Sequence, residues 1–239
     1  MAETTYAYSA QPVRNPFRYA LALWRTVRDP SNTDDVAIVE IGALRTRFGR
    51  RFMKPAAMLE ALAGDQRTAS RLRELRPFAP IDLSALARLP AGTLGRVVAD
   101  HLGPRGLNPN LTNLPTDTQE LLLLHHLYAT HDLWHVLTGW GNDVDGETGL
   151  AGFYAAQLGA PPFFAMGFAL LIMNAVFFQP TTLRSRIEAW NAGWQAGLRA
   201  EPLFGLDWPS LWSVPIAELR VRLRLDQAEI VGEGIRLAA

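Results

Sequence analysis

Hydrophobic positions recur along most of the chain at the spacing of helices, and no stretch shows the alternation of β-branched residues that is typical of strands. In the first clear case, Phe17, Leu21 and Trp24 share one face of a helix predicted from Pro16 to Arg28. A proline in the first turn suits a helix start. The Asp29-Pro30 step should end the helix, because the residue before a proline disfavours the helical conformation. The pattern therefore predicts an all-α fold.

Similar apolar runs, bounded by prolines, glycines and capping residues, predict the other elements. We expect further helices from Thr33 or Asp34 to Arg45, from Pro55 towards Arg73, from the turn at Gly92 to Gly95 as far as Leu102, from Thr118 to Leu137, from Asp145 to Leu158, after the Pro161-Pro162 step as far as about Phe178, from Thr181 or Thr182 to Arg199, and from Pro215 to Leu225. No internal repeat is visible. We expect one domain over residues 1–239, a bundle of roughly eight to nine helices with a loosely ordered arm at residues 1–14.

The segment from Pro161 to Phe178 is the most apolar part of the chain. Its length approaches that of a membrane span, which takes about 20 residues. Asn174 interrupts it, and two prolines open it. We interpret it as a buried or lipid-lining helix, with a membrane span and partial insertion at the interface as the alternatives.

Composition and charge narrow the function classes. Apolar residues make up 49% of the chain and charged residues 19%, which is typical of a globular protein. The 23 basic and 23 acidic residues balance, so a general nucleic-acid binder is not indicated. The absence of cysteine excludes disulfides, thiolate zinc sites and thiol nucleophiles. The start of the chain shows no secretory signal, and a bacterial cytoplasmic protein is the simplest interpretation.

The candidate chemistry centres on the sequence His131-Asp132-Leu133-Trp134-His135. Two histidines four apart project from one face of a helix, one turn apart. Asp132 lies about 100° round from His131, and Glu147 opens the next helix, which the glycine turn at residues 139–141 could fold back alongside. Two imidazoles and two carboxylates suit zinc, iron(II) or manganese(II).

Ordinary helix residues are the alternative explanation, although unpaired ionisable groups among leucines need partners or a metal. The remaining histidines carry weaker signals. His125 lies seven residues before Asp132 and either orients a ligand or is a core histidine. We expect His101 at the surface or at a helix end.

The spacing His131-Asp132-x-x-His135, with Glu147 twelve residues further on, resembles the signature of the coenzyme Q biosynthesis protein 4 family. That pattern is specific, and the resemblance extends from about residue 20 to 225. Shorter similar stretches support it at residues 94–96, 190–193 and 215–220.

The resemblance implies an all-helical fold, a divalent metal that is usually zinc, and peripheral association with a membrane. It implies removal of the ring C1 carboxylate of a prenylated ubiquinone precursor, coupled to C1 hydroxylation, and also a role in organising other enzymes of the pathway. By matching positions, the metal ligands and catalytic residues would be His131, Asp132, His135 and Glu147. The chain lacks the mitochondrial segment of eukaryotic members, so we expect a bacterial relative at the inner face of the cytoplasmic membrane.

A prenylated substrate needs an apolar channel, which flexible and aromatic side chains can line. The candidates are Phe163, Phe164, Met166, Phe168, Met173 and Phe177, with plain core packing as the alternative. The first helix could meet anionic lipid through Arg14, Arg18 and Arg25, or could simply dock on the core.

The sequence is compatible with three functions. The leading hypothesis is a metal-dependent oxidative decarboxylase of a prenylated hydroxybenzoate. The second is a non-catalytic scaffold that binds prenyl lipid around a structural metal. The third, a helical His-Asp phosphohydrolase, uses His101 ahead of His131 and Asp132, but it leaves Glu147 without a role. We expect a homodimer, with other ubiquinone-biosynthesis enzymes as further partners.

Overall fold

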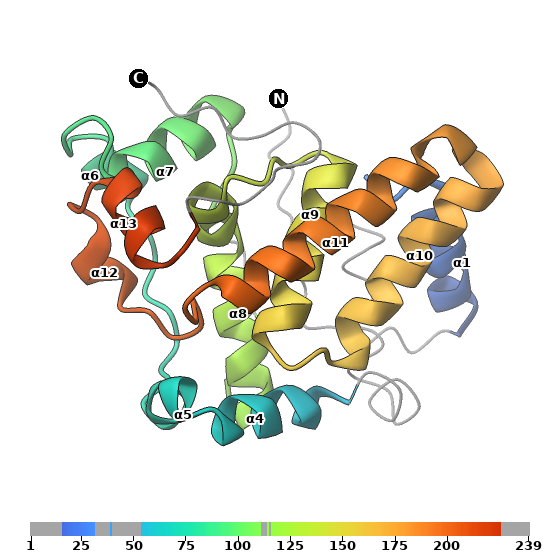
Figure 1. Cartoon of the computed structure of the whole chain (residues 1–239), viewed down its shortest axis with the longest axis horizontal. Helices are drawn as coiled ribbons and strands as arrows, with labels where there is room; N and C mark the ends of the chain where they lie inside the picture. The colour runs from blue at the N-terminus through green and yellow to red at the C-terminus, as the bar shows by residue number, and fades with distance from the viewer. Residues whose placement is uncertain (1–15, 32–38, 40–53, 111–113, 115, 226–239) are drawn as a thin grey trace.

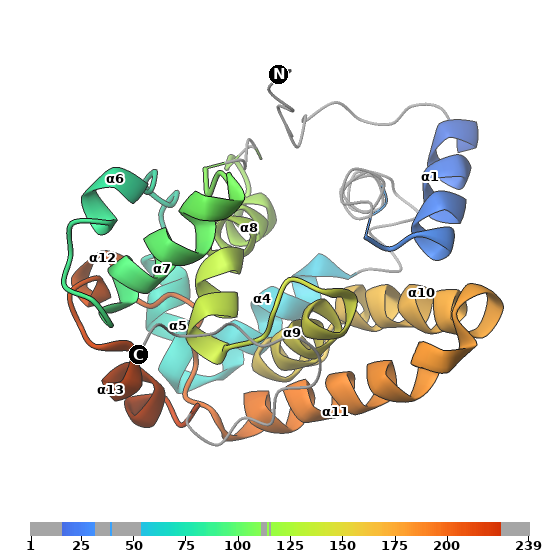
Figure 2. The same cartoon turned by 90° about the horizontal axis from the view of Figure 1, so that it is seen from above.

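The computed structural model describes residues 16–31, 39, 54–110, 114 and 116–225, and this part of the chain is all-α (Figures 1 and 2). It contains eleven α-helices, nine of them with seven or more residues, two 3-10 turns and no strand. An isolated bridge joins Thr93 to Pro215. The predicted all-α class is therefore confirmed.

The helices follow one another in the order in which the hydrophobic pattern places them. Their bounds are α1 (Pro16–Arg28), α4 (Pro55–Gly64), α5 (Gln66–Arg73), α6 (Leu83–Leu86), α7 (Leu94–Leu102), η1 (Gly103–Arg105), α8 (Gln119–Thr138), α9 (Val144–Gln157), α10 (Pro162–Phe178), η2 (Pro180–Thr182), α11 (Leu183–Arg199), α12 (Trp208–Leu211) and α13 (Ile216–Arg222).

The helix expected from Pro55 towards Arg73 is two helices, α4 and α5. The break falls at Asp65, whose backbone is extended and whose carboxylate accepts a hydrogen bond from the backbone N–H of Arg67. That capping bond starts a new helix directly after Gly64. The helix expected from Thr33 or Asp34 to Arg45 and the arm at residues 1–14 lie outside the described residues, apart from position 39.

Helix α8 is surrounded by other elements, and most of its residues are buried in the core. Trp134 is completely buried. The Thr118 side chain caps the start of α8, and Gly139 ends it with a φ of 91°. The guanidinium of Arg220, from α13, donates hydrogen bonds to the carbonyls of Val136 and Leu137 in the last turn. These carbonyls have no partner within the helix, so Arg220 fixes the end of α8 from outside.

Helices α9 and α11 pack against each other unusually closely because glycines line their contact. A Cβ atom at Gly193 of α11 would overlap the carbonyl oxygen of Gly149 of α9, and one at Gly152 would overlap the carbonyl of Trp190. Without side chains in the way, the two backbones come into van der Waals contact. This seam holds the helix that begins with Glu147 in a fixed position.

Helices α10 and α1 form a layer beside this pair (Figures 1 and 2). Asn174 of α10 is fully buried and donates to the carbonyl of Arg28 at the end of α1, while it accepts from Arg186 of α11. One polar contact therefore ties three helices together. None of the helices in the described part of the chain combines the length and apolar character that crossing a bilayer requires.

Candidate metal centre

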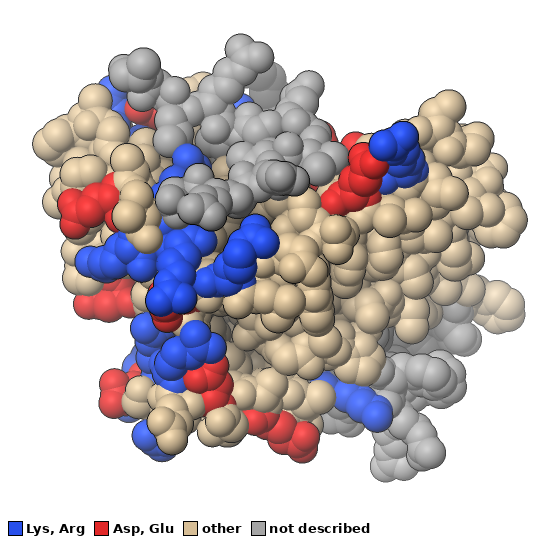
Figure 3. Space-filling model, in the orientation of Figure 1, with Lys and Arg blue, Asp and Glu red and all other residues tan. Residues whose placement is uncertain are grey.

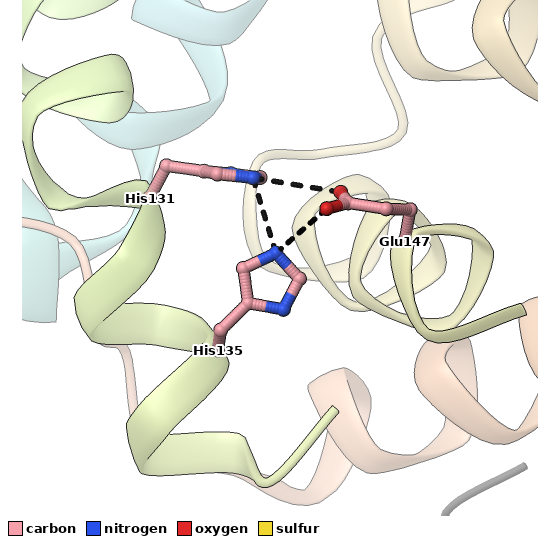
Figure 4. Close-up of side chains that lie close together, drawn as sticks. All are labelled: His131, His135 and Glu147. Atoms are coloured by element: carbon pink, nitrogen blue, oxygen red, sulfur yellow. Dashed lines mark hydrogen bonds and ion pairs between the residues drawn. The ribbon is translucent and has the colours of Figure 1, made fainter. Parts of the chain in front are cut away.

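Two helices bring three potential metal ligands to one point (Figure 4). His131 and His135 project from α8, and Glu147 projects from the first turn of α9. One ligand atom from each residue lies within 4.8 Å of the others. The two Nε2 atoms are 3.1 Å apart, and the Glu147 oxygens lie 3.5 Å from His131 Nε2 and 3.2 Å from His135 Nε2. The geometric prediction that the second helix folds Glu147 back onto the histidines is confirmed.

The turn between α8 and α9 makes this approach possible. Gly139 adopts the left-handed conformation that ends α8. The Asp143 carboxylate then caps α9 by accepting from the backbone N–H groups of Asp145 and Gly146. Gly146 also lies against the backbone of Gly141, where a Cβ would overlap the carbonyl oxygen. The turn is therefore tight, and Glu147 directly follows Gly146 in the first turn of α9.

His135 is prepared as a ligand by its second nitrogen. Its Nδ1 lies 3.0 Å from the carbonyl oxygen of Trp140. Because a carbonyl only accepts, Nδ1 must carry the proton, and the neutral ring presents its Nε2 lone pair to the cluster. His135 is fully buried, so the ring cannot turn away into solvent.

The three residues fit a divalent cation. His135 Nε2 and both Glu147 oxygens are acceptors, and only His131 could bring a proton into the space between them. Two imidazoles and one carboxylate are borderline-hard ligands of the kind that zinc, iron(II) and manganese(II) use. The His131 and Glu147 side chains keep 38% and 41% of their surface exposed, so the cluster also opens towards solvent on one side. An open side is what a catalytic metal site needs, whereas a structural site is closed.

The electrostatic surroundings of Glu147 also favour a cation at this site. Burial raises the pKa of this carboxyl, but the positive charge and hydrogen bonds that the His135 and His131 rings supply when protonated outweigh burial and hold the pKa well below its usual range. The site therefore favours the carboxylate form of Glu147 when positive charge lies beside it, and a bound cation would supply such a charge.

Asp132 does not join the group of three. It is half-buried next to His131 in the chain, and its charge acts on Tyr154 and His101. Its predicted role as a fourth ligand stays a prediction, because the structure places it beside the cluster and not in it.

The helix-end prediction for His101 is confirmed, because the residue lies in the last turn of α7, but the residue is not at the surface. The residue is only 5% exposed, and its Nε2 lies 2.8 Å from the Asn142 side-chain oxygen, in the turn before α9. Burial and the neighbouring Arg105 lower the pKa of His101. The apolar surroundings of α7 draw the ring inward, which its position near the helix end did not reveal. His101 therefore supports the turn that positions Glu147.

The other two histidines of α8 lie outside the metal cluster. His126 is buried edge-on against Phe78 and Phe204, and burial lowers its pKa to about 4. It is a neutral core histidine. His125 is half-buried, and its predicted role in orienting a ligand stays a prediction.

Sequence reasoning missed Tyr154 of α9. Its ring stacks on Trp134 at 4.2 Å, on Phe164 at 5.4 Å and, more offset, on His131 at 6.1 Å, all within 14° of parallel. Burial, with the charges of Glu147 and Asp132, raises the pKa of its phenol well above the ordinary value. A spacing of seven from Glu147 puts both side chains on one face of the helix, and that signal could have identified it.

The six predicted tail-lining residues of α10 fall into two sets. Phe163 belongs to the core, Phe164 stacks on Tyr154 beside the cluster, and Phe168 stacks on Trp190. The other three are exposed, namely Met166 (39%), Met173 (43%) and Phe177 (68%). Phe164 contacts Tyr154 next to the cluster and Phe163 contacts Phe164, and the lining role of the set stays a prediction.

The fold and the site together define the class: an all-α protein in which two consecutive helices present two imidazoles and one carboxylate to a single point. A family model described as coenzyme Q (ubiquinone) biosynthesis protein Coq4 matches residues 20–229, and the chain belongs to that family. The resemblance drawn from the motif is confirmed.

Relatives and a solved structure agree with this assignment. The chain is 28% identical over 215 residues to the mitochondrial ubiquinone biosynthesis protein COQ4 homolog of Bos taurus, covering 87% of this chain and 76% of the bovine protein. It is 29% identical to the COQ4 protein of Eremothecium gossypii, over 60% of this chain and 44% of that one, so it spans about half the length of several curated relatives. A crystal structure of a candidate ubiquinone biosynthesis protein from Nostoc punctiforme PCC 73102 superposes with a TM-score of 0.73 at 28% identity, covering 89% of this chain and 99% of that one.

Proposed function

We propose that this protein performs a metal-dependent step of ubiquinone biosynthesis, the oxidative decarboxylation of a prenylated hydroxybenzoate at a membrane surface. The observation that carries the proposal is the convergence of His131, His135 and Glu147 on an open-sided site, in a chain of the ubiquinone-biosynthesis family. When bound there, a divalent cation would supply a Lewis acid for the phenolate or carboxylate oxygen of the ring.

The chain's own residues would supply binding and orientation. His131, His135 and Glu147 would hold the cation, with His135 kept in register by the Trp140 carbonyl. Phe164, which is partly exposed, stacks on the buried Tyr154 next to His131 and would offer an aromatic face to a substrate ring. Phe163 continues this aromatic face towards the core. A bound substrate ring that displaced water from this side would strengthen the electrostatic interactions of its oxygens.

The reaction breaks the bond between C1 and the carboxylate carbon, which leaves as carbon dioxide, and forms a bond from C1 to oxygen. This change is a two-electron oxidation of the ring, so the proposal includes dioxygen as the oxidant: water supplies the hydroxyl oxygen, and dioxygen takes up the two electrons and ends as hydrogen peroxide. Iron(II) or manganese(II) could engage dioxygen, whereas zinc could serve only as a Lewis acid. The metals that support turnover would therefore show whether the cation engages dioxygen or acts only as a Lewis acid.

The membrane part of the proposal is supported by the layer of α1 and α10. Phe17 (84% exposed), Trp24 (55%) and Phe177 (68%) present large apolar side chains on these neighbouring helices. Arg18 and Arg25 of α1 are exposed on the same helix, and basic residues beside apolar ones suit an anionic bilayer. In the view of Figure 3, charged side chains gather mainly over the end formed by α5, α12 and α13, and a smaller charged group lies over α11 near the end of α10.

The experiment is a turnover assay with the carboxylated, prenylated precursor, the purified protein and one metal at a time. Carbon dioxide release and the C1-hydroxylated product should appear with at least one metal, and neither should appear with Glu147→Ala or His131→Ala. Full complementation of a quinone-deficient strain by both variants would refute the proposal. A protein that retains a prenyl lipid but forms no product with any metal would instead be the lipid-binding scaffold, which the exposed face of α1 and α10 also suits.

A further inference from the structure

The Tyr154 hydroxyl is a buried hydrogen-bond donor that lacks an acceptor. The residue is 4% exposed, and the described part of the chain offers its oxygen no hydrogen-bond partner. Buried hydroxyl groups almost always have one, so an exception next to a candidate metal site calls for an explanation. Tyr154 lies at such a site, because its ring stacks nearly parallel to that of His131.

The acceptor that the hydroxyl needs is best sought at Glu147. The two residues are seven apart on α9 and share one face of that helix. The Tyr154 ring centre lies 6.1 Å from that of His131, whose Nε2 is 3.5 Å from a Glu147 oxygen, so the phenol and the carboxylate flank the same imidazole. Glu147 and then Asp132 are the charges that act most strongly on Tyr154.

Metal binding would leave one Glu147 oxygen in need of a donor. Without a metal, one carboxylate oxygen lies near His135 Nε2 and the other near His131 Nε2. A cation held by both imidazoles uses both of these nitrogen lone pairs, so neither nitrogen can then donate to Glu147. The oxygen that the cation does not take therefore loses its neighbour, while the Tyr154 hydroxyl has a proton to donate.

We propose that the Tyr154 hydroxyl donates a hydrogen bond to the Glu147 oxygen that the metal does not take. Tyr154 is then a positioning residue: it orients the carboxylate without touching the metal. The inference rests on the metal site of the proposed function. Partners that orient a metal ligand in this way typically change metal affinity by about 10–100-fold.

The test is Tyr154→Phe, which removes one oxygen and keeps the stacked ring. Zinc affinity, measured by competition with a chelating dye, should fall about tenfold, and the visible absorption of the cobalt(II) form should change in position and intensity. The melting temperature in chelator should stay the same or rise, because the hydroxyl has no partner to lose in the metal-free protein. The matched control is Tyr19→Phe on α1, whose hydroxyl contacts the Val39 carbonyl and which should leave both metal readouts unchanged.

A double-mutant cycle with Glu147→Asp tests the named partner. The shorter carboxylate moves away from Tyr154, so removing the hydroxyl in that background should have little further effect on zinc affinity. An undiminished tenfold loss there would show that the hydroxyl acts through another group and would overturn the inference. A Tyr154→Phe protein that fails to fold or melts well below the wild type in chelator would overturn it too, because the hydroxyl would then have a structural partner.

These readouts separate the inference from the proposed function. Equal zinc affinity and cobalt spectra for Tyr154→Phe and the wild type would overturn the inference and leave the proposed function standing. A wild-type protein that binds none of zinc, cobalt or iron sinks both. Since no arm measures turnover, a failed decarboxylation assay would bear on the proposed function only.

Discussion

The tautomer of His135 is set by the hydrogen bond of its Nδ1 atom, the nitrogen that faces away from the cluster. Its Nδ1 proton is committed to the Trp140 carbonyl, which leaves Nε2 as an acceptor aimed at His131 and Glu147. A histidine with both nitrogens in solvent would choose its tautomer freely and hold a metal less well. The spacing of the motif gives the direction of the ring, but the tautomer depends on where the following turn places a carbonyl.

At this scale the first prediction concerns Glu147→Gln. The amide cannot offer the anionic oxygen that a divalent cation prefers, and we expect metal affinity to fall by more than about 100-fold, beyond the range for residues that merely orient a ligand. The melting temperature in chelator should stay close to that of the wild type. Calorimetric zinc titration checks this, with the exposed Glu60→Gln on α4 as control. Wild-type affinity in Glu147→Gln would remove this carboxylate from the site.

The second prediction concerns the buried His126. Its pKa is about 4 in the folded protein and about 6.5 when unfolded, so protons bind the unfolded state more readily. Its contribution to stability is complete above pH 6.5 and is lost as the pH falls towards 4, by roughly 3 kcal/mol in total. We expect His126→Phe to lose correspondingly less stability between pH 7 and pH 4 than the wild type, measured by urea unfolding in chelator. Equal pH dependence in the two proteins would contradict the assignment.

At the scale of elements, the site depends on the contact between α9 and α11 as much as on its ligands. Helix α9 begins with the capping residue Asp143 and presents Glu147 in its first turn. Its position is fixed by the glycine seam with α11 and by the tight turn from α8. The hydrophobic pattern predicted both helices. It did not predict their close contact, because glycines add nothing to such a pattern.

The third prediction tests this seam with Gly193→Ala. The added methyl group would overlap the backbone carbonyl of Gly149, which cannot move without shifting α9. Overpacking of this kind destabilises a protein by about 3 kcal/mol, which lowers the melting temperature by roughly 6–12 °C in a chain of this size. Thermal unfolding measures it.

The matched control is Gly167→Ala on α10, where a Cβ would meet nothing within 4 Å. Alanine is the better helix former by about 0.5–1 kcal/mol, so this variant should melt at the same temperature or slightly higher. If Gly193→Ala were as stable as Gly167→Ala, the contact between α9 and α11 would be looser than the structure has it.

At the scale of the whole molecule, large exposed apolar side chains are concentrated on two neighbouring helices. Phe17 and Trp24 of α1 and Phe177 of α10 are exposed, and the exposed Arg18 and Arg25 of α1 lie on the same helix. Exposed apolar patches on a soluble domain usually mark an interaction surface. The proposed membrane contact, the homodimer and the binding of other ubiquinone-biosynthesis enzymes all compete for such a surface.

The fourth prediction separates the membrane from these other partners. We expect the double variant Phe17→Ser, Phe177→Ser to bind vesicles with anionic lipid at least about tenfold more weakly, since burying one phenylalanine is worth about 1.5–3 kcal/mol. Cosedimentation with vesicles measures this. The control is Val221→Ser on α13, which is 64% exposed but lies away from α1 and α10. Equal vesicle binding by all three proteins would assign the apolar face to a protein partner.

The sequence by itself determined the all-α class, nearly all helix positions and the three residues that form the cluster. It could do so because helical periodicity is local, and because two histidines one turn apart must share a face. Asp132 lies on the same helix, but it is about 100° round the helix axis from His131. Helix α9 packs against the histidine side, so Asp132 stays outside the group.

Only the tertiary structure decided the rest. The break at Asp65, the inward turn of His101, the glycine seam and the place of Tyr154 against His131 all depend on contacts between segments far apart in the chain. Such contacts leave no period in the sequence, because a glycine or tyrosine has the same local preferences whether or not another helix lies against it. The packing of α9 between α8 and α11 therefore turned a motif into a site.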